Sequence, residues 1–252
     1  MSVTKSFGRG SGGEVLALQD VDLHVGKGEL VLLTGPSGAG KTTLLRTIFA
    51  AERPEGGEIV VAGRNISRLR RSSIPFLRRN IGVIFQDFKL LKDRSAIDNV
   101  AITLDIRGIR RKESHARALE ALGAVGLAEA AEKRVSCLSG GEQQRIAIAR
   151  AVVGVPAILL ADEPTGNLDP ELSHDILDLL DSISRRGTTV MLATHDPMVV
   201  ANASCTRLVR LERGRIVAME QGVRAPIAPP RLLTPTPQGL DAGVLQPAEA
   251  LS

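Results

Sequence analysis

The stretch that decides the fold is GPSGAGKTT at residues 35–43. It follows ELVLLTG, an apolar run that predicts a strand over 29–35, and it leads into KTTLLRTIFAA, which predicts a helix over 41–51. This spacing fits the pattern G-x-x-x-x-G-K-[ST] in the strand–loop–helix context of a phosphate-binding loop. The glycines let successive backbone N–H groups point at phosphate oxygens, and the helix start adds the positive end of its dipole. The sequence therefore predicts a site for a nucleoside triphosphate.

Two side chains at the end of this loop have specific predicted roles. Lys41 is expected to reach the β- and γ-phosphates, where it also acts in catalysis, and the Thr42 hydroxyl is expected to bind Mg²⁺. The residues of the loop predicted to bind nucleotide are Gly35, Pro36, Ser37, Gly38, Ala39, Gly40, Lys41, Thr42 and Thr43.

The stretch ILLADEPTGNLD at 158–169 indicates what happens to the nucleotide. Four apolar residues end a predicted buried strand, and Asp162 lies at its carboxyl end, where it can hold Mg²⁺ through water. Glu163 follows, and a carboxylate beside the metal aspartate can orient and deprotonate an attacking water. An acidic pair at a helix N-terminus is the alternative, but Pro164 disfavours it. We therefore predict hydrolysis, with Glu163 as the base.

Two more polar residues end predicted strands. His195 ends TTVMLATH and Gln86 ends IGVIFQ. Ligands of open parallel sheets lie at the carboxyl ends of the strands, so His195 can reach the γ-phosphate and the Gln86 amide can reach the metal or the water. A lone histidine at a strand end is usually structural or exposed, so from position alone both interpretations stay open.

Strands alternating with helices predict an α/β fold around a largely parallel sheet. The segment from about 87 to 155 is rich in helices, which predicts a helical subdomain inserted into the sheet domain. The predicted strands are 29–35, 58–63, 81–86, 157–162 and 188–194, and the further predicted helices are 114–126, 141–153 and 170–186.

Residues 1–220 are expected to form one domain. The stretch 221–252 holds six of the thirteen prolines and has neither helical nor strand periodicity, so we expect a disordered tail.

Composition places the chain among soluble globular proteins, with 43% apolar and 24% charged residues. The longest apolar runs are too short to span a bilayer, and the N-terminus has no signal-peptide pattern, so a cytoplasmic location is expected. The two cysteines, Cys137 and Cys205, have no metal-ligand spacing, and neither is assigned a function.

Charge is unevenly distributed along the chain. The net charge is +4, but residues 64–112 hold thirteen Lys or Arg against four Asp. Such an excess can face nucleic acid or the anionic inner leaflet of a membrane, or simply water.

The ordered set of motifs resembles the ATP-binding-cassette ATPases. The motifs are GPSGAGKTT (Walker A, 35–43), Gln86 (Q-loop), LSGGEQQR (signature, 138–145), ILLADEP (Walker B, 158–164), GNLD (D-loop, 166–169) and His195 (switch histidine). The resemblance covers nearly all of residues 3–220. It implies a P-loop fold with a small antiparallel β part, with ATP and Mg²⁺ as ligands.

The resemblance also implies that two copies complete each site. Ser139, Gly140 and Gly141 would approach the γ-phosphate held by the Walker A loop of the opposite copy, and Asp169 would line the seam between copies. Gln86 would bind the metal and begin the stretch that contacts a membrane partner.

Within the superfamily, IPFLRRNIGVIFQDFKLLKDRSAIDNV at 74–100 is similar to the FtsE family of cell-division ATPases. That similarity implies a homodimer on the cytoplasmic face of the membrane at the division site. It also implies the integral membrane partner FtsX, with ATP-driven motion controlling cell-wall hydrolases. No nucleic-acid partner is expected.

The N-terminus departs from the family pattern. Members usually begin with a strand ending in an aromatic that stacks on adenine, and here the chain starts near that point with SVTKSF. We therefore expect most of the first strand to be missing. Phe7 is the candidate for adenine stacking.

Three alternatives remain open. The first is the ATPase subunit of a lipoprotein-releasing or macrolide-exporting transporter, which shares nearly every catalytic residue. A DNA-repair ATPase is the second, but such proteins insert a long coiled coil where only 98 residues separate Lys41 from Ser139. The third is a nucleotide-binding scaffold without turnover, which the presence of Glu163 and His195 does not favour.

Overall fold

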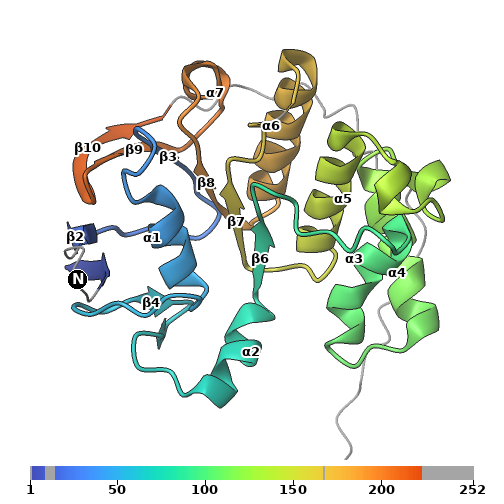
Figure 1. Cartoon of the computed structure of the whole chain (residues 1–252), viewed down its shortest axis with the longest axis horizontal. Coiled ribbons are helices and arrows are strands. Elements are labelled where there is room, and N and C mark those ends of the chain that lie inside the picture. Colours follow the sequence, from blue (N-terminus) through green and yellow to red (C-terminus); the bar gives the residue numbers. More distant parts are fainter. Residues whose placement is uncertain (1, 9–14, 167, 223–252) are drawn as a thin grey trace, which may run out of the picture.

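The computed structural model describes residues 2–8, 15–166 and 168–222, built around one six-stranded sheet (Figure 1). The strand order is β10-β9-β3-β8-β7-β6, and every neighbouring pair is parallel except β10 with β9. The strands are β3 (Leu30–Thr34), β6 (Ile81–Ile84), β7 (Ile158–Asp162), β8 (Thr189–Ala193), β9 (Arg207–Glu212) and β10 (Arg215–Gln221). The predicted α/β fold with a mainly parallel sheet is confirmed.

The central strands are apolar on both faces because both faces are covered. All five residues of β3 are buried, and all five of β8 are buried as well. Leu30 and Leu32 face one hydrophobic cluster, whereas Val31 and Leu33 face the other. This is the period of two that a strand imposes, and it gives the near-continuous apolar runs typical of parallel sheets.

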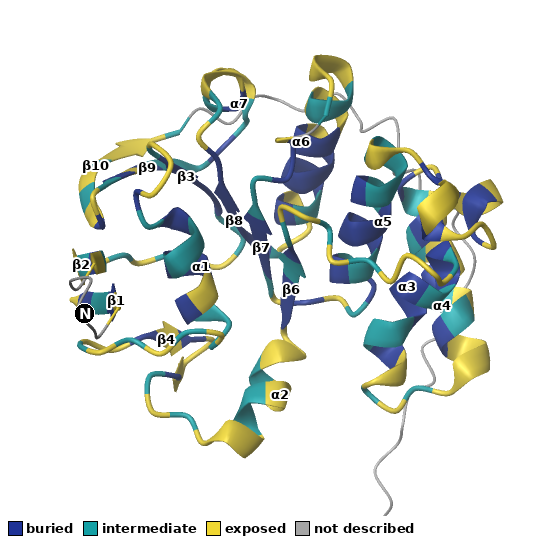
Figure 2. Cartoon of the chain, viewed as in Figure 1, coloured by how far each residue is buried: buried dark blue, intermediate teal, exposed yellow. Residues whose placement is uncertain are grey.

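Helices cover the sheet on its two sides, and their inner faces are the buried ones (Figure 2). One cluster joins a sheet face to the helices of the α3–α6 group, and the other joins the opposite face to α1 and the small β elements. The helices are α1 (Lys41–Ile48), α2 (Ile74–Arg78), α3 (Ala96–Asp105), α4 (Arg111–Ala124), α5 (Gly140–Val152), α6 (Pro170–Arg185) and α7 (Pro197–Asn202).

Helices α3, α4 and α5 gather at one side of the molecule, at the right in Figure 1. They share buried residues, among them Leu104, Leu122 and Ile146. Three short 3₁₀ turns complete the irregular segments, at Arg71–Ser73, Ala128–Ala130 and Val135–Cys137. The predicted strand-poor segment therefore has the expected helices, although its standing as a separate subdomain stays a prediction.

A short first strand forms from the residues where only the end of a strand was expected. Strand β1 (Val3–Phe7) pairs antiparallel with β2 (Val15–Val21), and Phe7 lies opposite Val15. Val3 is buried in the hydrophobic cluster that also contains Val31 and Leu33 of β3.

The strand expected over 58–63 is also different from the prediction. Only β4 (Val60–Val61) forms there, and it pairs antiparallel with β5 (Arg64–Asn65) outside the main sheet. The left-handed backbone at Ala62 and Gly63 reverses the chain after two strand residues. The segment therefore makes a hairpin instead of a central strand.

The proposed disordered tail lies almost entirely outside the described residues. Gln221 belongs to β10, and Gly222 is the last residue described. Within the described part of the chain, no helix has the length and apolar character needed to cross a bilayer.

Candidate nucleotide site

The phosphate-binding loop joins β3 to α1 at the carboxyl edge of the sheet. Gly35 and Gly40 both have left-handed backbone angles, with φ of 136° and 106°. A side chain at Gly35 would collide with the carbonyl of Leu211, and one at Gly40 would collide with the carbonyl of Ala17. These two positions therefore require glycine for conformation and for space, which keeps the loop close to the neighbouring backbone.

Lys41 is buried inside this loop. Its ammonium donates hydrogen bonds to the carbonyl oxygens of Gly35 at 2.7 Å and Pro36 at 3.1 Å. Its Nζ also lies 4.0 Å from Oε1 of Glu163. Burial lowers the pKa of Lys41 below its ordinary value, and the nearby carboxylates of Glu163 and Asp162 oppose that shift. A bound phosphate would add negative charge where this cation has lost water.

Thr42 and Asp162 form the adjacent polar pair. The Thr42 hydroxyl donates to Oδ1 of Asp162 at 3.0 Å, which joins the start of α1 to the end of β7. Burial raises the pKa of Asp162, while the Thr42 hydrogen bond and the Lys41 and Arg46 cations work in the opposite direction. An ionised carboxylate at this position is therefore short of a compensating positive charge.

That arrangement fits Mg²⁺. Among the described residues, no cluster of three or more His, Cys, Asp or Glu side chains could hold a metal by itself. Mg²⁺ commonly takes one or two protein oxygens and completes its shell with water and substrate phosphate oxygens. The hydroxyl of Thr42 and the carboxylate of Asp162 are oxygen ligands of this kind, in contact with each other beside the phosphate loop.

Glu163 is held by three donors from the end of the neighbouring strand β8. His195 Nδ1 lies 2.7 Å from its Oε1, while the Thr194 hydroxyl donates to Oε2 at 3.2 Å and the His195 backbone N–H donates there at 3.4 Å. Glu163 also has a left-handed backbone, with φ of 48°. This conformation turns the carboxylate away from the line of β7, and such strain is typical of functional positions.

These groups surround one pocket of about 230 Å³. Loop residues 37–43 line it together with Gln86, Glu163 and His195, and residues 15–17 of β2 form its apolar side. The structure thus brings the Walker A, Q-loop, Walker B and switch-histidine residues into one place, although they are separated by up to 158 positions in the sequence.

Phe7 does not line that pocket. It ends β1 opposite Val15, which does line it, and the Phe7 ring is 39% exposed with the Lys5 ammonium 5.0 Å from its centre. Residues 9–14, which join Phe7 to Val15, lie outside the described residues. Adenine stacking by Phe7 therefore stays a prediction.

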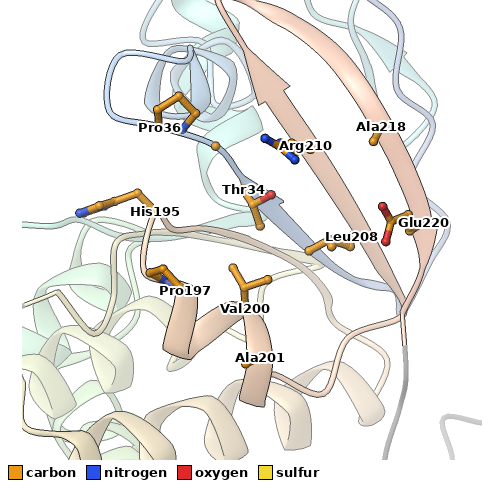
Figure 3. Close-up of a pocket in the computed structure, with 11 residues that line it drawn as sticks. Thr34, Pro36, His195, Pro197, Val200, Ala201, Leu208, Arg210, Ala218 and Glu220 are labelled. Carbon is orange, nitrogen blue, oxygen red and sulfur yellow. The ribbon is translucent and has the colours of Figure 1, made fainter.

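A larger cavity of about 520 Å³ lies on the other side of the phosphate loop (Figure 3). His195 lines both spaces, whereas Pro36 lines only the larger one. The rest of the larger lining comes mainly from α7, β9 and β10, among them Val200 and Leu208. In this view the His195 ring points away from Val200 and Leu208. The cavity contains neither Lys41 nor Glu163, so the smaller pocket is the candidate site.

The signature residues lie apart from this pocket. Ser139 is the N-cap of α5, and its hydroxyl accepts from the N–H of Glu142 at 3.3 Å. The Glu142 carboxylate accepts in return from the Ser139 N–H at 2.8 Å, which completes a capping box. The hydrogen bonds that the Glu142 carboxylate accepts from the Ser139 N–H and from the Ser139 hydroxyl lower the pKa of Glu142. None of Ser139, Gly140 and Gly141 is among the described residues that line the pocket.

The two signature glycines differ in their surroundings. A side chain at Gly140 would meet open space, whereas one at Gly141 would collide with Cδ2 of Leu172 on α6. Gly141 is therefore also a packing requirement within the chain, which sequence reasoning did not foresee. Asp169 caps the same helix α6, where its carboxylate accepts from the N–H of Leu172 at 2.9 Å, and its side chain is exposed.

Sequence reasoning missed two residues that join α5 to the site. The side chain of Gln144 is fully buried and donates to the carbonyl of Pro164, directly after Glu163, at 2.6 Å. Arg150 donates to the carbonyls of Phe88 and Lys89, just after Gln86, at 2.6 Å each. Both lie in LSGGEQQRIAIAR, but their spacing alone gives no signal for these partners.

Comparison with known proteins now gives the class. Residues 18–166 match the family described as ABC transporter, and the chain belongs to that family. The solved dimer of the ATP-binding cassette MJ0796, in a post-hydrolysis state with ADP and Pi, superposes with a TM-score of 0.81 at 35% identity. The superposed region covers 87% of this chain and 96% of the MJ0796 chain. The protein is an ABC ATPase, and its reaction converts ATP and water into ADP and phosphate.

The curated relatives narrow the class further. The chain is 51% identical over 200 residues to the cell division ATP-binding protein FtsE of Escherichia coli, covering 79% of this chain and 90% of the relative. It is 49% identical over 205 residues to FtsE of Mycobacterium tuberculosis, covering 81% and 89%. The protein is therefore an ABC ATPase of the cell-division FtsE type.

Proposed function

We propose that two copies of this chain close around two ATP molecules on the cytoplasmic face of the cell membrane and drive the membrane protein FtsX. Hydrolysis in this complex regulates cell-wall hydrolases at the division site. Identity of 42–51% to proteins named FtsE over most of the chain supports this assignment.

The proposed dimer rests on one observation: the phosphate-loop pocket and the signature helix start, both suited to an anion, lie apart within the chain. The pocket around Lys41 lacks the signature residues, and the space beside Gly140 is open. Ser139 caps a 13-residue helix, whose N-terminus presents N–H groups and the positive end of a dipole to an anion. A second copy would bring that helix start to the γ-phosphate, while its exposed Asp169 would lie along the seam between copies.

The proposed hydrolysis uses side chains that lie close together in the pocket, with Glu163 as the base and Lys41 4.0 Å from it. Glu163 takes a proton from the attacking water, whose oxygen forms a bond to the γ-phosphorus while the bond to the β–γ bridging oxygen breaks. ADP leaves with that oxygen, and phosphate is the second product. Lys41 stabilises the charge that moves onto the phosphate oxygens. When bound at Thr42 and Asp162, with Gln86 beside it, Mg²⁺ would supply further positive charge there.

His195 has two roles in this proposal. Its ring, 2.7 Å from the Glu163 carboxylate, orients the base, and its exposed side allows it to reach the γ-phosphate when nucleotide is bound. Thr194 holds the second carboxylate oxygen. Phe7, on the strand beside the apolar wall of the pocket, is proposed to stack on adenine.

Capture of the membrane partner tests this function. Glu163→Gln removes the base but keeps the shape of the side chain, so the variant should bind ATP, fail to hydrolyse it and remain as a closed dimer. Purified from membranes with ATP, it should bring FtsX with it. Lys41→Ala, which should lose nucleotide binding, is the matched control.

Recovery of a lipoprotein-release permease in place of FtsX would contradict the assignment and favour a transporter subunit. An unchanged ATPase rate for Glu163→Gln would contradict the role of the base itself.

A further inference from the structure

One surface segment has a composition that the nucleotide site does not explain. Residues 59–86 contain six arginines and neither aspartate nor glutamate. All six lie in residues 64–79, called here the arginine segment, which comprises β5, the turn Arg71–Ser73 and α2. This segment projects from the lower edge of the molecule and is largely exposed (Figure 2).

Five of these arginines have guanidinium groups that no carboxylate of the described residues neutralises. Each is exposed, and none has an ion-pair partner among the described residues. They are Arg64, Arg68, Arg70, Arg71 and Arg79. The projection therefore concentrates positive charge that the protein itself leaves uncompensated. Isolated exposed charges are ordinary, but five cations within 16 residues repel one another and favour an anionic partner.

Helix α2 is held against the rest of the molecule by two of its residues, while an aromatic ring of the same helix is exposed. Leu77 packs against the core, and Arg78 donates to the carbonyls of Phe49 and Ala50 at 3.1 Å each. Phe76 of the same helix is 57% exposed, although a ring of this size is usually buried. The Arg79 guanidinium lies 4.9 Å from the centre of that ring.

We propose that the arginine segment binds the surface of an anionic lipid bilayer directly. Guanidinium groups match phosphate oxygens as paired donors, and an exposed aromatic among cations is the combination found in segments that lie in a membrane interface. Phe76 enters the boundary between headgroups and acyl chains, while Arg70, Arg71 and Arg79 contact phosphodiesters. The protein thus has a membrane contact of its own, besides any contact made through a membrane partner.

The exposed ring favours lipid over nucleic acid. One face of Phe76 is already covered by Arg79, which hinders base stacking, whereas insertion into a bilayer needs only the apolar edge. The proposal is separate from the assignment to an FtsE-type complex, because vesicle binding is measured without any membrane protein.

The experiment is vesicle co-sedimentation of the full chain without nucleotide. Phosphatidylcholine vesicles with phosphatidylglycerol should retain the protein, and pure phosphatidylcholine vesicles should not. Each cation near such a surface contributes roughly a fivefold factor, so Arg70→Glu/Arg71→Glu should weaken binding at least about 25-fold. Phe76→Ser should weaken it with all charges in place, and raising the salt concentration should weaken binding of the wild type.

The control is Lys27→Glu/Arg186→Glu, which changes the net charge equally at exposed positions outside the arginine segment. This variant should bind vesicles nearly as the wild type does. ATPase activity of all variants should remain, which shows that each is folded. Equal losses in both charge variants, or wild-type binding by Arg70→Glu/Arg71→Glu, would overturn the proposal. So would tighter binding to duplex DNA than to the anionic vesicles.

Discussion

At the scale of single residues, the candidate site holds charged side chains whose ionised forms are destabilised by burial. Lys41, Asp162 and Glu163 lie together with little water, and burial shifts the pKa of Lys41 down and that of Asp162 up. Both shifts mean that the charged forms are less favourable here than in water. The nucleotide-free protein therefore keeps a destabilised site that phosphate and a cation can relieve.

Asp162→Asn tests this interpretation. The folded-state pKa of Asp162 is raised, so the folded protein binds more protons than the unfolded chain just above the ordinary pKa, and this residue's contribution to stability falls as pH rises. The penalty therefore grows as pH rises above the ordinary carboxyl pKa. The variant keeps an oxygen for the Thr42 hydrogen bond, so without nucleotide it should unfold at a higher temperature than wild type at pH 7.

The pH dependence gives the sharper check. The advantage of Asp162→Asn should shrink as pH falls, because protonation relieves the wild-type carboxyl too, and it should vanish below the ordinary carboxyl pKa. Thermal unfolding of both proteins from pH 7 to about pH 3, below the ordinary carboxyl pKa, measures this difference. A variant less stable than wild type at pH 7, or an advantage independent of pH, contradicts the proposed desolvation.

Several residues that the sequence motifs singled out line one pocket in the structure, although their roles stay predictions. A phosphate loop must place a lysine and a hydroxyl at fixed offsets, so GPSGAGKTT alone identifies Lys41 and Thr42 as candidates. Thr194 and Gln144 were not predicted, because each acts through a single hydrogen bond to a residue at least 20 positions away. Such contacts depend on the tertiary arrangement and leave no local spacing.

At the scale of elements, the strands that are mostly buried were the ones that could be located from the sequence. The strands β3, β6, β7 and β8 are buried and read as apolar runs, so their positions were found from sequence. Strands β9 and β10 were missed, because they mix arginines and glutamates with apolar residues and have a face that is only partly covered. The left-handed pair Arg213 and Gly214 joins them in a tight turn, and this Arg-Gly step was the available signal.

The start of α5 is a capped helix N-terminus with one open side. Ser139 and Glu142 satisfy each other's backbone N–H groups and leave the open side beside Gly140 for another partner. Ser139→Ala should therefore lower the free energy of unfolding by about 1 kcal/mol, the usual cost of losing an N-cap. Urea unfolding without nucleotide measures this change.

Ser72→Ala is the control, since that exposed serine caps no α-helix. Unfolding of Ser139→Ala with the same midpoint as this control would show that the capping box contributes nothing to stability.

At the scale of the whole molecule, the phosphate loop and the signature segment lie on different parts of the fold. The phosphate loop belongs to the sheet and α1, whereas the signature belongs to the helical group at the other side (Figure 1). Gln144 and Arg150 connect that group to the segments after Glu163 and Gln86. In the proposed dimer, closure of the second copy would therefore be transmitted through α5 to the catalytic edge.

The most direct measurement is ATPase complementation between two inactive variants. Ser139→Arg keeps an intact phosphate loop and should bind ATP without hydrolysing it, and Lys41→Ala keeps an intact signature without a nucleotide anchor. A one-to-one mixture places Lys41 of the first variant opposite Ser139 of the second. We predict that the mixture recovers roughly a quarter of the wild-type rate, because about half of the pairs are mixed and each has one complete site. Hydrolysis by Ser139→Arg alone at the wild-type rate would contradict a site shared between two copies.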